Sequence, residues 1–195
     1  MTRLLVATTN RGKQAEFRRL LAGVPAEVVM PADVGVDLDV PEPFDTYAEN
    51  AMAKADAYSR ASGLPCLADD SGIEVAALGW GPGVHSARWR AGRTADAVLE
   101  ALAGEADRRA RMVCVVAVAD PRDGEPRIQT FRGVVEGSIA RQRRGEGGFG
   151  YDPVFLLPSG VTTAELPPAE KDRLSHRGRA VVAATGHLRQ LLVER

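Results

Sequence analysis

The sequence has little of what a secreted, membrane-spanning or strongly basic protein needs. Its two cysteines, Cys66 and Cys114, provide neither the spacing of a metal site nor a disulfide framework. The longest unbroken apolar run, Met112–Ala119, covers eight residues, whereas a bilayer-spanning helix needs roughly 20. The formal net charge is −1, so the overall basic field typical of nucleic-acid-binding proteins is missing.

The N-terminus offers no targeting signal either. It passes from Met1-Thr2-Arg3 directly into a strand-like run, without the apolar region and cleavage site of a secretory signal. We therefore expect a soluble protein of a reducing compartment, the cytoplasm, with neither membrane nor nucleic acid as a partner.

Lysine and asparagine are also scarce. Only three of the 25 basic residues are lysine, at positions 13, 54 and 171, and the two asparagines are Asn10 and Asn50. In a chain so biased towards arginine, a lysine is expected where a compact ammonium fits and a planar guanidinium does not. With so few residues, chance is the alternative explanation.

The 195 residues, 45% of them hydrophobic, suffice for one domain or two intimately joined lobes. Strand-like and helix-like segments alternate, which predicts a mixed α/β fold. Strands are expected at residues 3–8, 28–30, 66–68, 112–119, 128–139 and 154–157, and helices at 12–21, 47–62, 94–109 and from 176 towards the C-terminus. Thr46 and Glu49 form a capping box, Ser175 is the expected cap of the last helix, and loops are expected at 79–83 and 121–124.

The first candidate for chemistry is the turn Thr8-Thr9-Asn10-Arg11-Gly12-Lys13, between a strand and a helix N-terminus. Main-chain N–H groups and the helix dipole favour phosphate there, and Lys13 adds a positive charge. The turn is no Walker A loop, because its first glycine is missing and Gln14 replaces the Ser or Thr. A purely structural strand–turn–helix is the alternative.

The second candidate is Asp69-Asp70-Ser71-Gly72, expected where a short strand ends. Adjacent carboxylates repel, and hard oxygen ligands suit Mg²⁺. An Asx-type turn is the alternative, because Asp-Ser-Gly is favourable turn chemistry. Glu42 could add a third carboxylate, or it could be merely solvated.

Three further segments carry candidate residues. Asn50 and Lys54 lie four apart and are expected on one helix face, away from Ala51, Ala55 and Tyr58. The glycines around Phe149 leave its ring open for stacking on a base, unless the ring is part of the core. The donors of the segment 171–177 gather at an expected helix start, which favours an anionic or carbonyl-bearing partner.

In chain order these segments resemble the inosine triphosphate pyrophosphatase family, also called XTP/dITP diphosphatases. The matching strings are Ala7-Thr8-Thr9-Asn10-Arg11-Gly12-Lys13, Tyr47-Ala48-Glu49-Asn50-Ala51-x-x-Lys54-Ala55, Leu67-Ala68-Asp69-Asp70-Ser71-Gly72, Gly81-Pro82-Gly83-Val84-His85-Ser86-Ala87-Arg88, Gly148-Phe149-Gly150-Tyr151-Asp152-Pro153-Val154-Phe155 and Ser175-His176-Arg177. They span nearly the whole chain, and six in order are highly specific.

The resemblance implies a homodimeric enzyme with an elongated, curved mixed sheet, two lobes and a central cleft. It implies Mg²⁺-dependent hydrolysis of ITP, dITP and XTP to the monophosphate and pyrophosphate. By the same resemblance, Asp70 is the catalytic base, and Asp70 and Glu42 are the metal ligands. The implied substrate-binding residues are Thr8, Thr9, Asn10, Arg11, Gly12, Lys13, Lys54, Ser71, Phe149, Gly150, Tyr151, Asp152, Lys171, His176 and Arg177.

Three other functions compete with this interpretation. A kinase or general NTPase would use the same phosphate turn, but Walker A and kinase signatures are missing. A nucleotide sensor would bind without turnover, although it would gain little from a strained carboxylate pair. Nucleic-acid binding through Arg141, Arg143 and Arg144 competes with a solvated loop or a dimer edge.

Overall fold

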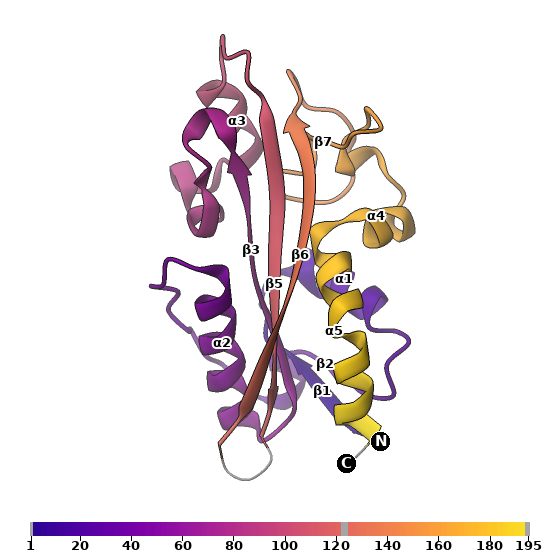
Figure 1. Ribbon diagram of the computed structural model, residues 1–195. Helices are drawn as coiled ribbons and strands as arrows, with labels where there is room; N and C mark the ends of the chain where they lie inside the picture. Colours follow the sequence, from indigo (N-terminus) through magenta and orange to yellow (C-terminus); the bar gives the residue numbers. More distant parts are fainter. Residues whose placement is uncertain (1, 122–124, 194–195) are drawn as a thin grey trace. The chain divides into compact units, whose positions relative to one another are not determined.

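The computed structural model describes residues 2–121 and 125–193, arranged as strands alternating with helices (Figure 1). The helices are α1 (Arg11–Leu20), α2 (Tyr47–Ser62), α3 (Thr94–Ala101), α4 (Pro168–Leu174) and α5 (His176–Val193). The strands are β1 (Arg3–Val6), β2 (Glu27–Val29), β3 (Cys66–Val75), β4 (Gly81–Pro82), β5 (Arg109–Asp120), β6 (Arg127–Ile139) and β7 (Phe155–Leu156). Most of the expected turn at 121–124 lies outside the described residues.

The strands form one mixed sheet in the order β2-β1-β3-β5-β6-β7, with β4 paired to β3. β1 is parallel to both β2 and β3, whereas β4 and β7 pair antiparallel with β3 and β6. Because β1 lies between two parallel neighbours, its apolar side chains are buried on both faces: Leu4, Leu5 and Val6 are fully buried. The predicted mixed α/β class is confirmed.

The chain divides into two compact units. The first combines residues 1–70, 115–133 and 179–195, and the second combines 71–114 and 134–178. Three of the strands, β3, β5 and β6, contribute residues to both units. The predicted single domain and its central cleft stay predictions.

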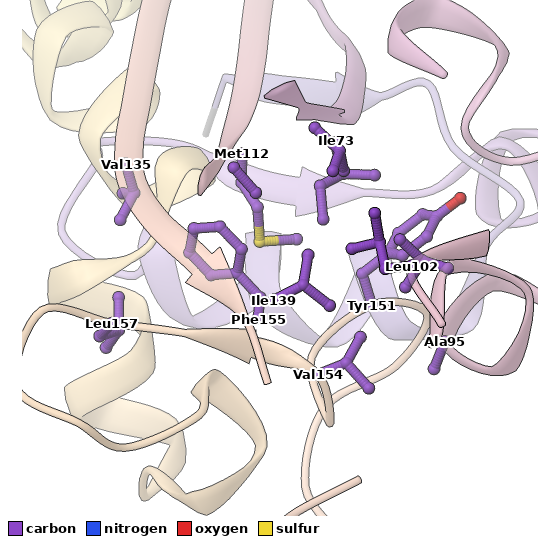
Figure 2. Close-up of a cluster of buried hydrophobic side chains, with 13 residues drawn as sticks. Ile73, Ala95, Leu102, Met112, Val135, Ile139, Tyr151, Val154, Phe155 and Leu157 are labelled. Atoms are coloured by element: carbon purple, nitrogen blue, oxygen red, sulfur yellow. The ribbon is translucent and has the colours of Figure 1, made fainter. Parts of the chain in front are cut away.

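Each unit has its own buried apolar residues. In the first, Phe17 of α1 and Leu188 of α5 are buried together with the β1 side chains. In the second, Ile73, Met112, Ile139 and other side chains from β3, α3, β5, β6 and the segment 151–157 form one cluster (Figure 2). Elements that carry candidate residues, such as α1 and β3, therefore also contribute buried apolar side chains.

The boundaries of α2 follow the predicted capping signals. The Thr46 side chain accepts a hydrogen bond from the Glu49 main-chain N–H at 3.2 Å and donates to the Glu49 carboxylate at 2.5 Å. At the other end, Gly63 adopts a left-handed conformation with φ +67°, which a residue without Cβ adopts readily. The prediction of this helix is confirmed.

The expected end of a strand at Asp69 is wrong, because β3 continues through Asp69-Asp70-Ser71-Gly72 to Val75. The turn propensity of Asp, Ser and Gly is local, and pairing across the sheet overrides it. The adjacent carboxylates still diverge, because successive side chains of a strand point to opposite faces. The expected loop at 79–83 likewise contains β4, which pairs with β3.

Two helical predictions also need correction. The helix expected at 94–109 ends at Ala101 as α3, and Gly104 beyond it has φ +83°, a conformation that does not continue a right-handed helix. The segment before Ser175 forms the separate helix α4, which was not predicted. Ser175 does cap α5, since its hydroxyl accepts from the Gly178 main-chain N–H at 3.0 Å.

Candidate functional site

The turn before α1 is shaped by its own polar side chains. Asn10 is the N-cap of α1, and its side-chain oxygen accepts from the Lys13 main-chain N–H at 3.1 Å. The Thr8 hydroxyl accepts from the Asn10 N–H at 3.2 Å, and the Gln14 amide donates to the Thr8 carbonyl at 2.9 Å. Thr9, Asn10 and Arg11 are exposed. The N-terminus of α1 is therefore accessible, and hydrogen bonds among residues 8–14 fix the conformation of the turn.

Lys13 connects this turn to β3. Its Nζ lies 3.0 Å from both carboxylate oxygens of Asp69, a residue that is 1% exposed. Asp69 therefore holds an ammonium group beside the helix N-terminus, which is the end of a helix that favours anions. The two features together suit a ligand with several negative charges.

Lys54 of α2 lies among acidic groups. Its Nζ donates to the Glu42 carboxylate, and to the main-chain oxygen of Asp69 at 2.6 Å. Burial acts to lower the pKa of Lys54, but the carboxylates of Asp69, Glu42 and Asp70 outweigh burial and raise it. Lys54 is therefore a fixed positive charge, and it brings Glu42 next to β3.

Asp70 follows Asp69 on β3 and is 5% exposed. Its Oδ2 accepts a hydrogen bond from the Asn50 amide at 3.0 Å. Burial raises the pKa of Asp70, partly opposed by Lys54 and Asn50, and the nearby Glu42 carboxylate raises it further. A buried carboxylate with a raised pKa is a typical candidate for proton transfer.

Asn50 was not among the predicted substrate-binding, catalytic or metal-binding residues, although the scarcity of asparagine had drawn attention to it. Its hydrogen bond to Asp70 was not predicted. The expected helix face was also partly wrong. Tyr58 lies four residues beyond Lys54, and its hydroxyl donates to the Leu38 carbonyl at 2.8 Å. Tyr58 therefore faces the same segment as Asn50 and Lys54, the acidic loop of residues 37–45. Spacing alone places these three on one side of α2.

A second group of candidate residues gathers around Phe149, all within the second unit. The Nζ of Lys171 lies 5.0 Å from the centre of the Phe149 ring, and the guanidinium carbon of Arg177 lies 5.7 Å from it. Arg177 also donates to the Ser71 hydroxyl at 3.0 Å. His176, 5% exposed, adjoins Arg177 in the first turn of α5. The structure thus brings Lys171, Arg177 and Ser71 together with the Phe149 ring.

The buried carboxylate of Asp152 binds two members of this cluster, Lys171 and Phe149. Its carboxylate, 3% exposed, accepts from Lys171 Nζ at 2.5 Å, from the Phe149 N–H at 2.6 Å and from the Thr163 hydroxyl at 2.8 Å. Thr163 was not predicted, because nothing local in the sequence relates it to Asp152. A buried ion pair that is also hydrogen-bonded fixes its members in one geometry.

The neighbours of Asp152 complete the turn. The Tyr151 hydroxyl donates to the Ser86 carbonyl at 2.8 Å, and burial raises the pKa of Tyr151 to about 12. The Tyr151 ring belongs to the buried cluster of the second unit. Gly150 has φ +62°. Tyr151 therefore anchors the turn to the buried cluster through its ring and to Ser86 through its hydroxyl.

We expect Gly148→Ala to disrupt this turn. Gly148 has φ +71°, and a Cβ built on it would lie 2.1 Å from the Asp152 carboxylate. The substitution should destabilise the protein by about 1–3 kcal/mol through backbone strain, and displace Asp152 as well. Chemical denaturation measures this loss, with Gly186→Ala as the control, because a Cβ on Gly186 has open space. Equal stabilities of the two variants would contradict the prediction.

Two carboxylates of the first unit suit a magnesium ion. Within residues 2–121 and 125–193, no group of three or more His, Cys, Asp or Glu side chains could hold a metal ion. Mg²⁺ needs fewer, because it is commonly held by one or two carboxylates, water and substrate phosphates. Asp70 and Glu42 are close enough for one carboxylate to raise the pKa of the other, so this donor set fits.

The protein therefore has a mixed α/β fold with two groups of candidate residues. The first is the set of lysines and carboxylates around Asp70 beside the N-terminus of α1, and the second surrounds Phe149. The chain belongs to the Ham1 family, whose family model matches residues 4–186. None of the helices within the described residues is long and apolar enough to span a membrane.

Individual relatives match along nearly their entire length. A dITP/XTP pyrophosphatase of Symbiobacterium thermophilum is 48% identical over 200 residues, covering 98% of both chains. Another, of Methylococcus capsulatus, is 48% identical and covers 97% of both. The solved structure of a HAM1 protein from Coxiella burnetii has a TM-score of 0.82 at 40% identity, with complete coverage of both chains.

Proposed function

We propose that this protein hydrolyses the non-standard purine nucleoside triphosphates ITP, dITP and XTP to the monophosphate and pyrophosphate. Such an activity would remove these nucleotides from the pool before they enter DNA or RNA. The observation that supports it most is the set of fixed charges around Asp70, where a helix N-terminus, Lys13 and Lys54 surround buried carboxylates. The names of relatives at 48% identity agree with this activity.

In the proposed reaction, the turn from Thr8 to Lys13 and Lys54 hold the triphosphate. Asp70 accepts a proton from the water that attacks the α-phosphorus, and the bond from that phosphorus to the pyrophosphate leaving group breaks. The ammonium groups offset the negative charge that develops on the leaving group. Asp70 and Glu42 would hold Mg²⁺, which when bound supplies further neutralisation of phosphate charge.

The cluster around Phe149 is proposed to select the base. Phe149 stacks on it, and Lys171, His176 and Arg177 offer donors to its edge. Hypoxanthine and xanthine carry a carbonyl oxygen at position 6, where adenine carries an amino group. Donors that meet an amino group are left without an acceptor, and such a mismatch can reject an analogue by about 10⁴-fold or more.

The alternatives receive less support. A kinase or a phosphatase of the terminal phosphate would release no pyrophosphate. A sensor would not need a buried carboxylate, such as Asp70, to accept a proton beside the cations. Two arginines suggested for nucleic-acid binding are paired within the chain, Arg143 with Asp96 at 2.9 Å and Arg144 with Glu165 at 3.1 Å. We also propose a homodimer in the cytoplasm, by resemblance to the family. Cys66 and Cys114 are buried thiols that are not joined in a disulfide.

The test is pyrophosphate release with Mg²⁺ from ITP, dITP, XTP, GTP, dGTP and ATP at equal concentration. We expect fast release from the first three substrates only; guanine shares the 6-carbonyl oxygen, so GTP and dGTP have to be refused at the 2-amino group. Release from all six would retain the reaction and contradict the proposed base selection. Binding of ITP without release from any substrate would contradict the enzyme and support the sensor.

Phe149→Ala should raise KM for every purine triphosphate, because stacking on an aromatic ring does not depend on the base. The expected loss corresponds to about 1–3 kcal/mol, with kcat changed little. Steady-state kinetics on ITP and GTP measures it, and Phe131→Ala on β6 serves as the control for loss of an aromatic ring. An unchanged KM would assign Phe149 to packing instead.

A further inference from the structure

The acidic loop 37–45 is held by one side of α2. Three residues of α2 spaced four apart bind it: Asn50 binds Phe44, Lys54 binds Glu42, and Tyr58 binds the carbonyl of Leu38. Side chains at this spacing lie above one another on a helix. The loop that carries Glu42 therefore takes its position from α2.

Asn50 differs from the other two members because it also binds a side chain of β3, the Asp70 carboxylate, whereas Lys54 binds only the main-chain oxygen of Asp69 there. Its Oδ1 accepts from the Phe44 main-chain N–H at 3.1 Å, and its Nδ2 donates to the Phe44 carbonyl at 3.1 Å and to Asp70 Oδ2 at 3.0 Å. Each polar atom of the amide thus has a partner, although the residue is only 1% exposed.

The orientation of this amide follows from its partners. A main-chain N–H can only donate, so the oxygen of Asn50 faces Phe44 N and the NH₂ group faces the two acceptors. The same NH₂ group therefore fixes the Phe44 carbonyl and one oxygen of Asp70. Glu42 is two residues from Phe44, so the side chain that binds Asp70 also holds the main chain near Glu42, whose carboxylate Lys54 binds.

The chemistry of an amide suits this position. An ammonium or guanidinium would form an ion pair with Asp70 and compete with the substrate's metal ion and water for its charge. An amide orients the carboxylate by a directional hydrogen bond and leaves its charge available. Phe44 itself is 41% exposed, and its main-chain N–H and carbonyl are both bound by Asn50.

We propose that Asn50 is a positioning residue that fixes the orientation of Asp70 and the place of the Glu42 loop for the reaction. This inference rests on the proposed function, because it gives Asp70 and Glu42 their roles. It makes two claims: the amide holds the loop through the main-chain N–H and carbonyl of Phe44, and its NH₂ group also orients Asp70.

Two variants separate the claims. Asn50→Leu removes both contacts with a side chain of similar size. Asn50→Asp keeps an oxygen for the Phe44 N–H, removes the NH₂ donor to Asp70 and to the Phe44 carbonyl, and places a second carboxylate beside Asp70. Ser59→Ala is the matched control: Ser59 is a fully buried residue of α2 whose hydroxyl donates to the Leu64 carbonyl at 2.9 Å, on the other side of the helix from the loop.

Two measurements read the outcome: amide hydrogen exchange at Phe44, and kcat and KM for pyrophosphate release from ITP. We expect faster exchange at Phe44 in Asn50→Leu and retained protection in Asn50→Asp. In both variants kcat should fall about 100-fold, the effect of a small misplacement of reacting groups, with KM within about threefold. Ser59→Ala should lower the melting temperature and leave both readouts as in the wild type.

Unchanged kcat in both Asn50 variants would overturn the orienting claim, and unchanged exchange at Phe44 in Asn50→Leu would overturn the loop claim. A fall in kcat that tracks the melting temperature in all three variants would reduce Asn50 to a structural residue. A wild-type protein that releases no pyrophosphate contradicts the proposed function instead, and exchange at Phe44 still tests the loop. If Asn50→Leu does not fold, Asn50→Asp carries the kinetic test.

Discussion

Asp70→Asn should reduce kcat for pyrophosphate release by about 10²–10⁴-fold, the range that a positioned proton acceptor contributes. An asparagine of the same shape can still present its oxygen to the Asn50 amide, so the contact at 3.0 Å need not be lost. What disappears is the negative charge that accepts a proton from water.

Binding of ITP to the same variant should remain measurable, because the turn 8–13 and the cluster around Phe149 are unchanged. Steady-state kinetics and equilibrium binding together give the result. Asp56→Asn is the control for loss of a carboxylate, because Asp56 forms an i,i+4 pair with Arg60 on the surface of α2. Retained turnover in Asp70→Asn would remove Asp70 from the reaction.

The second large effect is expected from Lys54→Met, which removes the charged amino group and keeps an unbranched side chain of nearly the same length. Lys54 binds Glu42 and the Asp69 carbonyl, so the variant loses both a phosphate-binding charge and the partner of a carboxylate. We expect kcat/KM to fall on the order of 10²–10³-fold, as for the loss of one charge-stabilising donor. Arg60→Met, on the exposed side of the same helix, is the matched control.

A pH profile of Lys54→Met supplies an independent readout. Lys54 lowers the pKa of Asp70, whereas burial and Glu42 raise it. Removing Lys54 therefore raises that pKa further, and the acid limb of the kcat/KM profile should move to higher pH. A fall in kcat/KM without this movement would mean that Lys54 acts on the substrate and not on Asp70.

Local signals in the sequence predicted the elements that carry the charged residues around Asp70. The Thr46–Glu49 capping box begins α2, and the apolar runs at residues 3–8 and 112–119 correspond to buried strands. In each case neighbours within four residues, or uninterrupted apolar character, decide the structure. The scarcity of lysine was a useful signal as well, since Lys13, Lys54 and Lys171 all belong to the two clusters.

Contacts between distant residues set the parts that were missed. β3 runs through an Asp-Asp-Ser-Gly segment because its neighbours in the sheet outweigh local turn chemistry. Asn50 meets Asp70 across 20 residues, and Thr163 meets Asp152 across 11. No spacing rule for helices or strands predicts such pairs, so their members are visible in the sequence only as isolated polar residues.

The passage of β3 through Asp69, Asp70 and Ser71 has a consequence for how this chain tolerates insertions and deletions. Asp69 meets Lys13 and Asp70 meets Asn50 because consecutive positions of a strand face opposite ways. Adding or deleting a single residue before Asp69 in this strand would invert the phase of every position that follows, and each acid would point to the opposite face of the sheet. A loop absorbs length changes, whereas this strand excludes odd-numbered ones. Length variation between family members should therefore fall outside residues 66–75.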